Sequence, residues 1–125
     1  MPWNSTSPHL GFSSREPWLP IGRAHRDLAV DVQQGTPASV LNLTRQCLDL
    51  RRAHAALHHG SMRVVEAGER KLVFERRQSS ERLLCTFNLS DRPCAFHKSG
   101  ASLLSTGDIG ADALEPYAAI IEEIA

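Results

Sequence analysis

The chain has few of the residues that mark disulfide-rich or metal-binding proteins. It has only three cysteines, Cys47, Cys85 and Cys94, and no two of them form a Cys-x-x-Cys motif. An odd number of cysteines without this spacing is typical of a reducing compartment, so we predict a cytoplasmic protein without a disulfide framework. The six histidines include the pair His58-His59 but no recognised spacing of zinc ligands. We therefore expect neither a metal site nor a cofactor.

The chain also lacks an excess of charge and a long apolar run. Fourteen lysines and arginines balance fourteen aspartates and glutamates. A neutral chain has no basic surface of the kind that binds nucleic acid or anionic membranes. No apolar segment approaches the ~20 residues that a membrane-spanning helix needs. We expect no nucleic-acid partner and no membrane partner.

Both tryptophans of the chain lie in the first twenty residues, and each has a proline beside it. The prolines predict an ordered loop for these twenty residues. Residues 1–35 as a whole are rich in Pro, Ser and Gly and show no sustained hydrophobic period, and a loop of this length is either functional or disordered. Within it, residues 29–34 are compatible with either a short extended piece or a short helix. Two indoles on a stiff loop can form a wall against the apolar face of a sugar. The alternative is that both rings cover the edge of a core.

A helix is predicted in the next segment, residues 36–59. Thr36 is a suitable N-cap residue and Pro37 is suited to the first helical turn, and the pattern continues to about Ala53. At about 100° per residue, six apolar side chains fall in one arc of the helix. This arc is too wide for one sheet contact, so we expect it to be only partly covered by the rest of the chain. Its members are Val40, Leu41, Leu43, Cys47, Leu48 and Leu50.

The hydrophobic period changes to two after Gly60, and residues 60–125 read as short strands with close turns. We predict an antiparallel β-sandwich, and an α+β fold for the whole chain. In the strongest strand, 82–90, one face should hold Leu83, Cys85, Phe87 and Leu89. Propensity alone favours helix for residues 116–125, but strand 82–90 needs a neighbour, and we predict a closing strand there. The other predicted strands are 62–66, 71–77, 94–97 and 102–105.

No catalytic constellation is visible in the sequence. Hydrolysis of a glycosidic bond needs two carboxyl groups that flank the bond. No motif places two of the carboxylates beside each other, and no Ser-His-Asp or Cys-His order is persuasive. We expect these groups to be solvated surface residues and identify no catalytic residue. The carboxylates considered are Asp27, Asp31, Asp49, Glu66, Glu69, Asp108 and the acidic tail.

Several short motifs of this chain together resemble a known family. In order, Met1-Pro2-Trp3, Gly11-Phe12-Ser13 and Pro17-Trp18-Leu19-Pro20 resemble the loop after the eighth strand of the catalytic barrel in alpha-glucosidases of the alpha-amylase family, glycoside hydrolase family thirteen. Residues 36–59 resemble the last barrel helix of that family. Residues 60–125 resemble its C-terminal sandwich, domain C, with Phe87-Asn88-Leu89-Ser90 in the central strand. Similar loops also occur in sucrose-cleaving and trehalose-forming relatives.

The resemblance implies hydrolysis of alpha-glucosidic bonds in carbohydrate metabolism, with the catalytic carboxylates on a barrel that precedes the loop. It places Trp3, Phe12 and Trp18 near the alpha-glucoside substrate. It also implies a C-terminal fragment that is inactive alone: a gene fragment, an excised domain or one half of a split glycosidase. Val40, Leu43 and Cys47 would then contact the barrel domain or mediate self-association. The alternative is an independent β-sandwich module that binds carbohydrate or protein.

Overall fold

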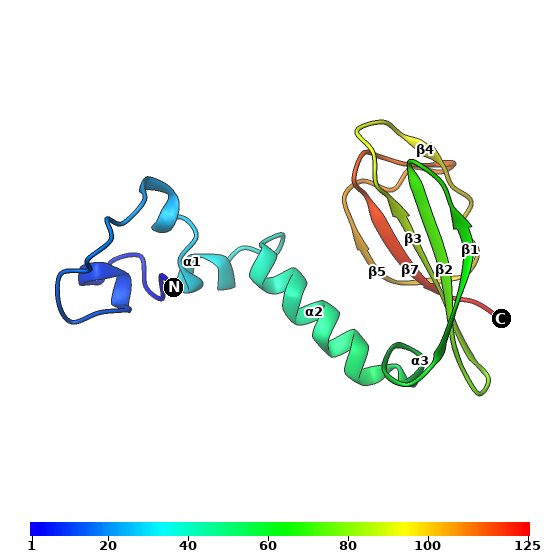
Figure 1. Ribbon diagram of the computed structural model, residues 1–125, viewed down its shortest axis with the longest axis horizontal. Coiled ribbons are helices and arrows are strands. Elements are labelled where there is room, and N and C mark those ends of the chain that lie inside the picture. The colour runs from blue at the N-terminus through cyan, green and yellow to red at the C-terminus, as the bar shows by residue number, and fades with distance from the viewer. The chain divides into compact units, whose positions relative to one another are not determined.

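The computed structural model describes residues Met1–Ala125 and confirms the predicted α+β class (Figure 1). The chain forms two compact units, Met1–Cys47 and Leu48–Ala125. Neither unit contains a helix that combines the length and the apolar character needed to cross a bilayer. The three predicted segments, 1–35, 36–59 and 60–125, stay a prediction about domain organisation.

Up to the start of the main helix, residues 1–39 of the first unit consist of loops joined by short helical turns. These are the 3-10 turns η1 (Pro8–Gly11) and η2 (Arg23–His25) and the short helix α1 (Val30–Gln34). The region that the sequence left open between strand and helix is therefore helical. The amide of Val30 donates to the carbonyl of Pro2, so the start of α1 is fastened to the N-terminal segment.

The main helix, α2 (Val40–Ala53), begins later than predicted. Its cap is Ser39 and not Thr36, because the hydroxyl of Ser39 accepts the amide of Asn42 at 3.2 Å. Thr36 instead donates its hydroxyl to the carbonyl of Val32, at the end of α1. Pro37 lies in the turn that precedes Ser39. The helix ends at Ala53 as predicted, and none of its side chains is buried, which confirms that the apolar arc is incompletely covered.

A second short helix, α3 (Ala55–His58), contacts strands β2 (Lys71–Gln78) and β3 (Glu81–Asn88) of the sheet. Glu81 fastens α3 through both oxygens of its carboxylate. One oxygen lies 2.7 Å from Nδ1 of His54, and the other accepts the amide of Ala56 at 2.6 Å. The amide of Ala56 and the His54 ring together hold the pKa of Glu81 below its usual value. The turn from α3 into the sheet needs Gly60, since a Cβ there would lie 2.4 Å from the carbonyl oxygen of Ala56.

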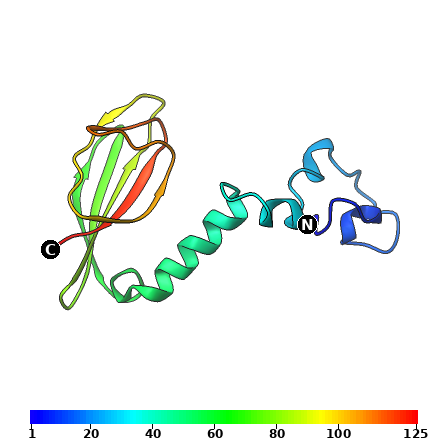
Figure 2. The same cartoon turned by 180° about the vertical axis from the view of Figure 1, so that it is seen from behind.

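The second unit is built on a five-stranded antiparallel sheet with the order β1-β2-β3-β7-β5. The last strand of the chain, β7, lies between β3 and β5 (Figure 2), which confirms the predicted closing strand. A two-stranded sheet, β4-β6, accompanies the five-stranded sheet, and β6 was not among the predicted strands. The strands are β1 (Ser61–Ala67), β2 (Lys71–Gln78), β3 (Glu81–Asn88), β4 (Cys94–Ala95), β5 (Ala101–Thr106), β6 (Ala113–Leu114) and β7 (Ala119–Glu123).

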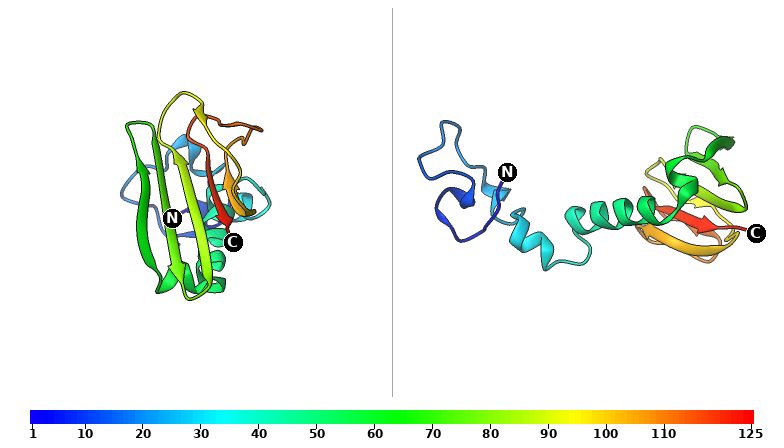
Figure 3. Two further views of the ribbon diagram at one scale, coloured as in Figure 1. Left: turned by 90° about the vertical axis from the view of Figure 1, so that its right-hand side faces the viewer. Right: turned by 90° about the horizontal axis from the view of Figure 1, so that it is seen from below.

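Strand β3 is central in the five-stranded sheet (Figure 3, left). Buried side chains lie on both of its faces. Leu83 and Cys85 are buried on one face, and burial raises the pKa of the Cys85 thiol to about 11. A buried cluster around Phe96, Leu114 and Ile120 forms the other part of the core. The prediction for Leu89 was wrong: β3 ends at Asn88, and Leu89 is 56% exposed in the turn that follows.

Candidate functional site

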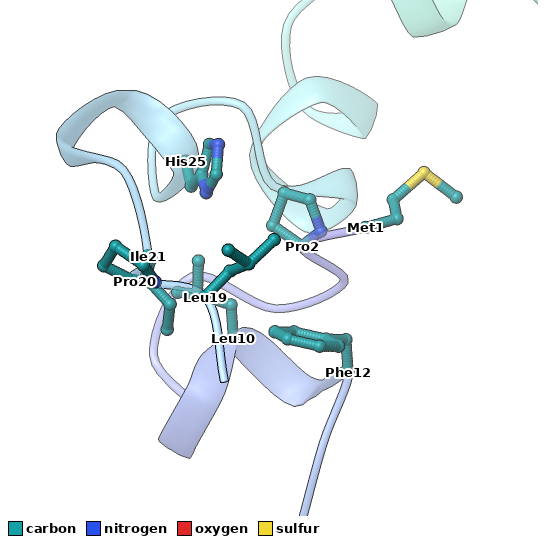
Figure 4. Close-up of a pocket in the computed structure, with 8 residues that line it drawn as sticks. All are labelled: Met1, Pro2, Leu10, Phe12, Leu19, Pro20, Ile21 and His25. Atoms are coloured by element: carbon teal, nitrogen blue, oxygen red, sulfur yellow. The ribbon is translucent and has the colours of Figure 1, made fainter. Parts of the chain in front are cut away.

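A hollow of about 300 Å³ lies within the first unit (Figure 4). Apolar side chains dominate its lining, and His25 supplies the one polar side chain. The ring of Phe12 points toward Leu10 and Leu19, and His25 lies across the hollow from Phe12. The remaining lining residues are Met1, Pro2, Pro20 and Ile21.

The backbone around this hollow is held in an unusual conformation. His9, Leu10 and Gly11 are consecutive residues with positive φ angles of 50°, 56° and 72°. The left-handed region is costly for residues with a Cβ, so the surrounding contacts must impose it. The carbonyl of Leu10 accepts the amides of Trp3 and Asn4 at 2.8 and 3.1 Å, and the Leu10 side chain is only 2% exposed. These contacts turn the Leu10 side chain into the hollow.

Asp31 fastens the start of α1 to the N-terminal loop. Its carboxylate accepts the backbone amide of Ser5 at 3.0 Å, the hydroxyl of Ser5 at 3.0 Å and the amide of Val32 at 2.9 Å. The amide of Ser5 is the main cause that lowers the pKa of Asp31. The ring of His25 accepts the amide of Gly22 through Nδ1 at 3.1 Å, which fixes the orientation of the imidazole toward the hollow.

Of the three residues that sequence analysis placed near a sugar, only Phe12 lines this hollow. Trp3 is next to Pro2 in the chain and is 52% exposed, and Phe12 is 47% exposed. Trp18 is 91% exposed and is not part of the hollow. The alternative, that both indoles cover the edge of a core, does not hold for Trp18, because its side chain is almost fully exposed. Whether the three aromatic residues meet a sugar stays a prediction.

Not all of the carboxylates are the solvated surface residues that we expected. Asp49 is exposed and pairs with Arg52 on the surface of α2, and Glu66 is half exposed and pairs with Lys71. Glu122 in the acidic tail is fully buried, so the expectation was wrong there. One oxygen of Glu122 accepts the amides of Ser99 and Gly100, while the other has no hydrogen-bond partner. No group of three or more His, Cys, Asp or Glu residues is arranged to hold a metal ion.

Glu75 is a buried carboxylate that sequence analysis did not single out. Nε of Arg82 donates to one of its oxygens at 2.9 Å, and Nη2 of Arg63 donates to the other at 2.6 Å. These two hydrogen bonds lower the pKa of Glu75 from 4.5 to about 2, and the bond from Arg82 has the larger effect. The feature of the sequence that could have identified Glu75 is the period of two in β2, which puts Glu75 on the same face as the buried Val73.

The lowered pKa of Glu75 predicts how the stability of the second unit depends on pH. A depressed pKa means that the folded state favours the ionised form, so the contribution is complete above about pH 4.5 and is lost as the pH falls toward 2. Glu75→Gln should lower the stability of the second unit at neutral pH. It should also reduce the loss of stability between about pH 4.5 and pH 2. Urea unfolding followed by circular dichroism across the pH range measures both effects. Glu69→Gln, in the exposed turn before β2, is the control, and an unchanged acid slope in Glu75→Gln would contradict the prediction.

Comparisons with known proteins extend over nearly all of the chain. Residues 1–60 match the family described as alpha amylase, catalytic domain. A probable alpha-glucosidase of Rhizobium meliloti (strain 1021) is 46% identical over 91 residues, which are 73% of this chain and 16% of that protein. A probable oligo-1,6-glucosidase 2 of Bacillus subtilis (strain 168) is 33% identical over 111 residues, which are 83% of this chain and 20% of that protein.

The fold agrees with a solved structure over almost its full length. The trehalulose synthase MutB from Pseudomonas mesoacidophila MX-45 matches with a TM-score of 0.84 and 22% identity, over 98% of this chain and 24% of that one. At this identity the likeness concerns the fold alone. The chain spans less than a quarter of the length of each of these three relatives.

Proposed function

This chain belongs to the alpha-amylase family, and we propose that it is the C-terminal part of an alpha-glucosidase, with hydrolysis of alpha-glucosidic bonds as the activity to which it contributes. The observation that carries the proposal is the 46% identity with a probable alpha-glucosidase over 91 residues. The match of residues 1–60 to a catalytic domain supports a role for the first unit at the active site and not in a separate module.

The first unit would contribute a wall of the substrate site. Its hollow is apolar, and the half-exposed Trp3 and Phe12 and the exposed Trp18 offer flat rings for contact with a sugar. The left-handed residues His9 and Leu10 and the Ser5–Asp31 hydrogen bonds keep the backbone of this wall in one conformation. The wall has no catalytic carboxylate pair in our proposal, so the acid and the nucleophile come from a further part of the catalytic domain.

The apolar arc of α2 would be the contact surface for that further part. Val40 and Cys47 are exposed, Leu43 is half-buried, and no side chain of this helix is buried. Exposed apolar surface of this kind is costly in water and is characteristic of interaction sites. The barrel domain of an alpha-glucosidase is the partner that we propose, since the chain spans only 16% of its relative.

Activity measurements test this proposal. We expect that the purified 125-residue chain does not release nitrophenol from 4-nitrophenyl alpha-glucoside above background. We expect turnover after addition of the Rhizobium meliloti relative truncated before the residues that align with Met1. Leu43→Asp should abolish this complementation, because a charge would be buried at the interface. Arg45→Asp, on the opposite side of α2, is the matched control and should retain it.

Three outcomes would contradict the proposal. Turnover by the isolated chain, in a preparation freed of contaminating glucosidase, would show that it contains a complete catalytic pair. Equal complementation by Leu43→Asp and wild type would show that α2 does not form the interface. The second candidate, an independent carbohydrate-binding module, is favoured by the high exposure of Trp18. Saturable binding of maltose by the isolated chain, lost in Trp18→Ala, would replace our proposal with this candidate.

A further inference from the structure

A second hollow lies on the five-stranded sheet and shares no lining residue with the hollow that Phe12 lines. It measures about 380 Å³ and is lined by residues of β1, β2 and β3 only. The strand register explains why they meet: Arg77 pairs with Ser61 of β1 and with Arg82 of β3, and Arg63 pairs with Glu75 in the next row. The lining is therefore one polar face of three adjacent strands, composed of Ser61, Arg63, Glu75, Arg77 and Arg82.

This hollow carries more positive charge than the protein neutralises. Three arginines face one glutamate, and both oxygens of Glu75 are already occupied by Arg63 and Arg82. Arg82 also donates through Nη1 to the backbone oxygen of Ala125. The side chain of Arg77 is exposed and takes part in none of the hydrogen bonds that hold Arg63 and Arg82, and Arg82 stands directly opposite it in the strand register. Like charges in opposed positions of two strands destabilise a sheet, so the arrangement favours an added anion.

The chemistry of the lining selects the kind of anion. A guanidinium presents several donors in one plane, which suits the oxygens of a phosphate group. Glu75 is 6% exposed and holds two of the guanidinium groups in place, so part of the site is organised before a ligand arrives. The volume is that of a small-molecule site. A large anionic partner could bind to a flat patch of arginines, so the hollow favours a small anion.

We propose that the hollow bounded by Ser61, Arg63, Arg77 and Arg82 binds a phosphate group, either as inorganic phosphate or as the phosphate of a sugar ester. In this arrangement Arg77 is the main donor, since its side chain takes part in none of the hydrogen bonds that hold Arg63 and Arg82. The donors of Arg63 that Glu75 leaves free complete the arrangement around the phosphate oxygens, while Ser61, whose hydroxyl donates to the carbonyl of Arg77, lines the edge of the hollow. Glu75 is a positioning residue that orients Arg63 and Arg82 and does not touch the anion.

Isothermal titration calorimetry on the full chain at low ionic strength tests the proposal, with inorganic phosphate and glucose 6-phosphate in separate titrations. We expect saturable binding of at least one of them, weakened by added sodium chloride. Arg77→Gln should weaken this binding about tenfold or more, because a charge-assisted hydrogen bond is lost. Arg70→Gln removes an exposed arginine just before the opposite end of β2 and should change the affinity less than about twofold.

The two ligands also separate the two sources of the phosphate group. Similar affinity for both would indicate that the site recognises the phosphate group itself, and tighter binding of glucose 6-phosphate would indicate contacts with the sugar as well. Absence of saturable binding for both ligands would overturn the proposal. Equal affinities of wild type and Arg77→Gln, with circular dichroism showing that both are folded, would overturn it too.

Discussion

Gly100→Ala is expected to destabilise the second unit by about 4 kcal/mol or more, which is at the upper end for a single substitution. A Cβ at this position would lie 1.9 Å from the carbonyl oxygen of Glu123 and 2.7 Å from its carbonyl carbon. Both atoms belong to the backbone of β7, so no side-chain rotation can relieve the clash. The amide of Gly100 also donates to the buried carboxylate of Glu122, and a shift of the backbone would break that bond.

Urea unfolding followed by circular dichroism measures this effect. Gly68→Ala is the matched control, because the nearest atom to a Cβ there is the carbonyl oxygen of Lys71 at 3.8 Å, an ordinary contact. We expect this variant to remain within about 0.5 kcal/mol of wild type, as is usual for exposed positions. If the two alanine variants were equally stable, the close approach of Gly100 to β7 would not exist in solution.

Leu83→Ala is expected to cost about 2–5 kcal/mol, the range for truncation of a fully buried leucine. Leu83 is 0% exposed and belongs to β3, the central strand, which is paired with both β2 and β7. Its loss would leave a cavity that the strands cannot close without giving up their register. Thermal unfolding and urea unfolding of the two proteins give the difference in free energy.

Leu89→Ala is the comparison that makes the Leu83 measurement informative. Sequence periodicity placed both leucines on the same buried face, but Leu89 is 56% exposed. We expect truncation of Leu89 to change the free energy of unfolding by less than about 0.5 kcal/mol. A loss at Leu89 as large as that at Leu83 would mean that β3 extends past Asn88 and that the buried face is longer than the structure has it.

The strands were predictable because local patterns set them. Alternation of apolar and polar residues located β1, β2 and β3 to within a residue or two, and tight turns between them imposed antiparallel pairing. The helix α2 was predictable in its body and its end, but its start was not. Both Thr36 and Ser39 are good caps by composition, and only the contacts of Thr36 with α1 leave Ser39 to close the helix.

The charged groups of the second unit show what the pattern could not reveal. Glu75 and Glu122 look like ordinary surface residues in the sequence, yet both are buried. Each is held by groups that come from elsewhere in the chain: Glu75 by Arg63 and Arg82, and Glu122 by amides of the Ser99-Gly100 turn. Such partners become neighbours only once the strands have paired.

The sequence by itself determined the α+β class, the body of α2, the incompletely covered apolar arc and the family resemblance, because each depends on the order of nearby residues. The tertiary structure bears out the closing strand predicted within residues 116–125, because the hydrogen bonds that β3 and β5 offer on both sides of residues 119–123 outweigh their helical propensity. Only the tertiary structure decided that Phe12 lines a hollow while Trp18 does not, and that three arginines surround Glu75. Sites of this kind depend on side chains from distant segments, and their proximity is a property of the folded chain.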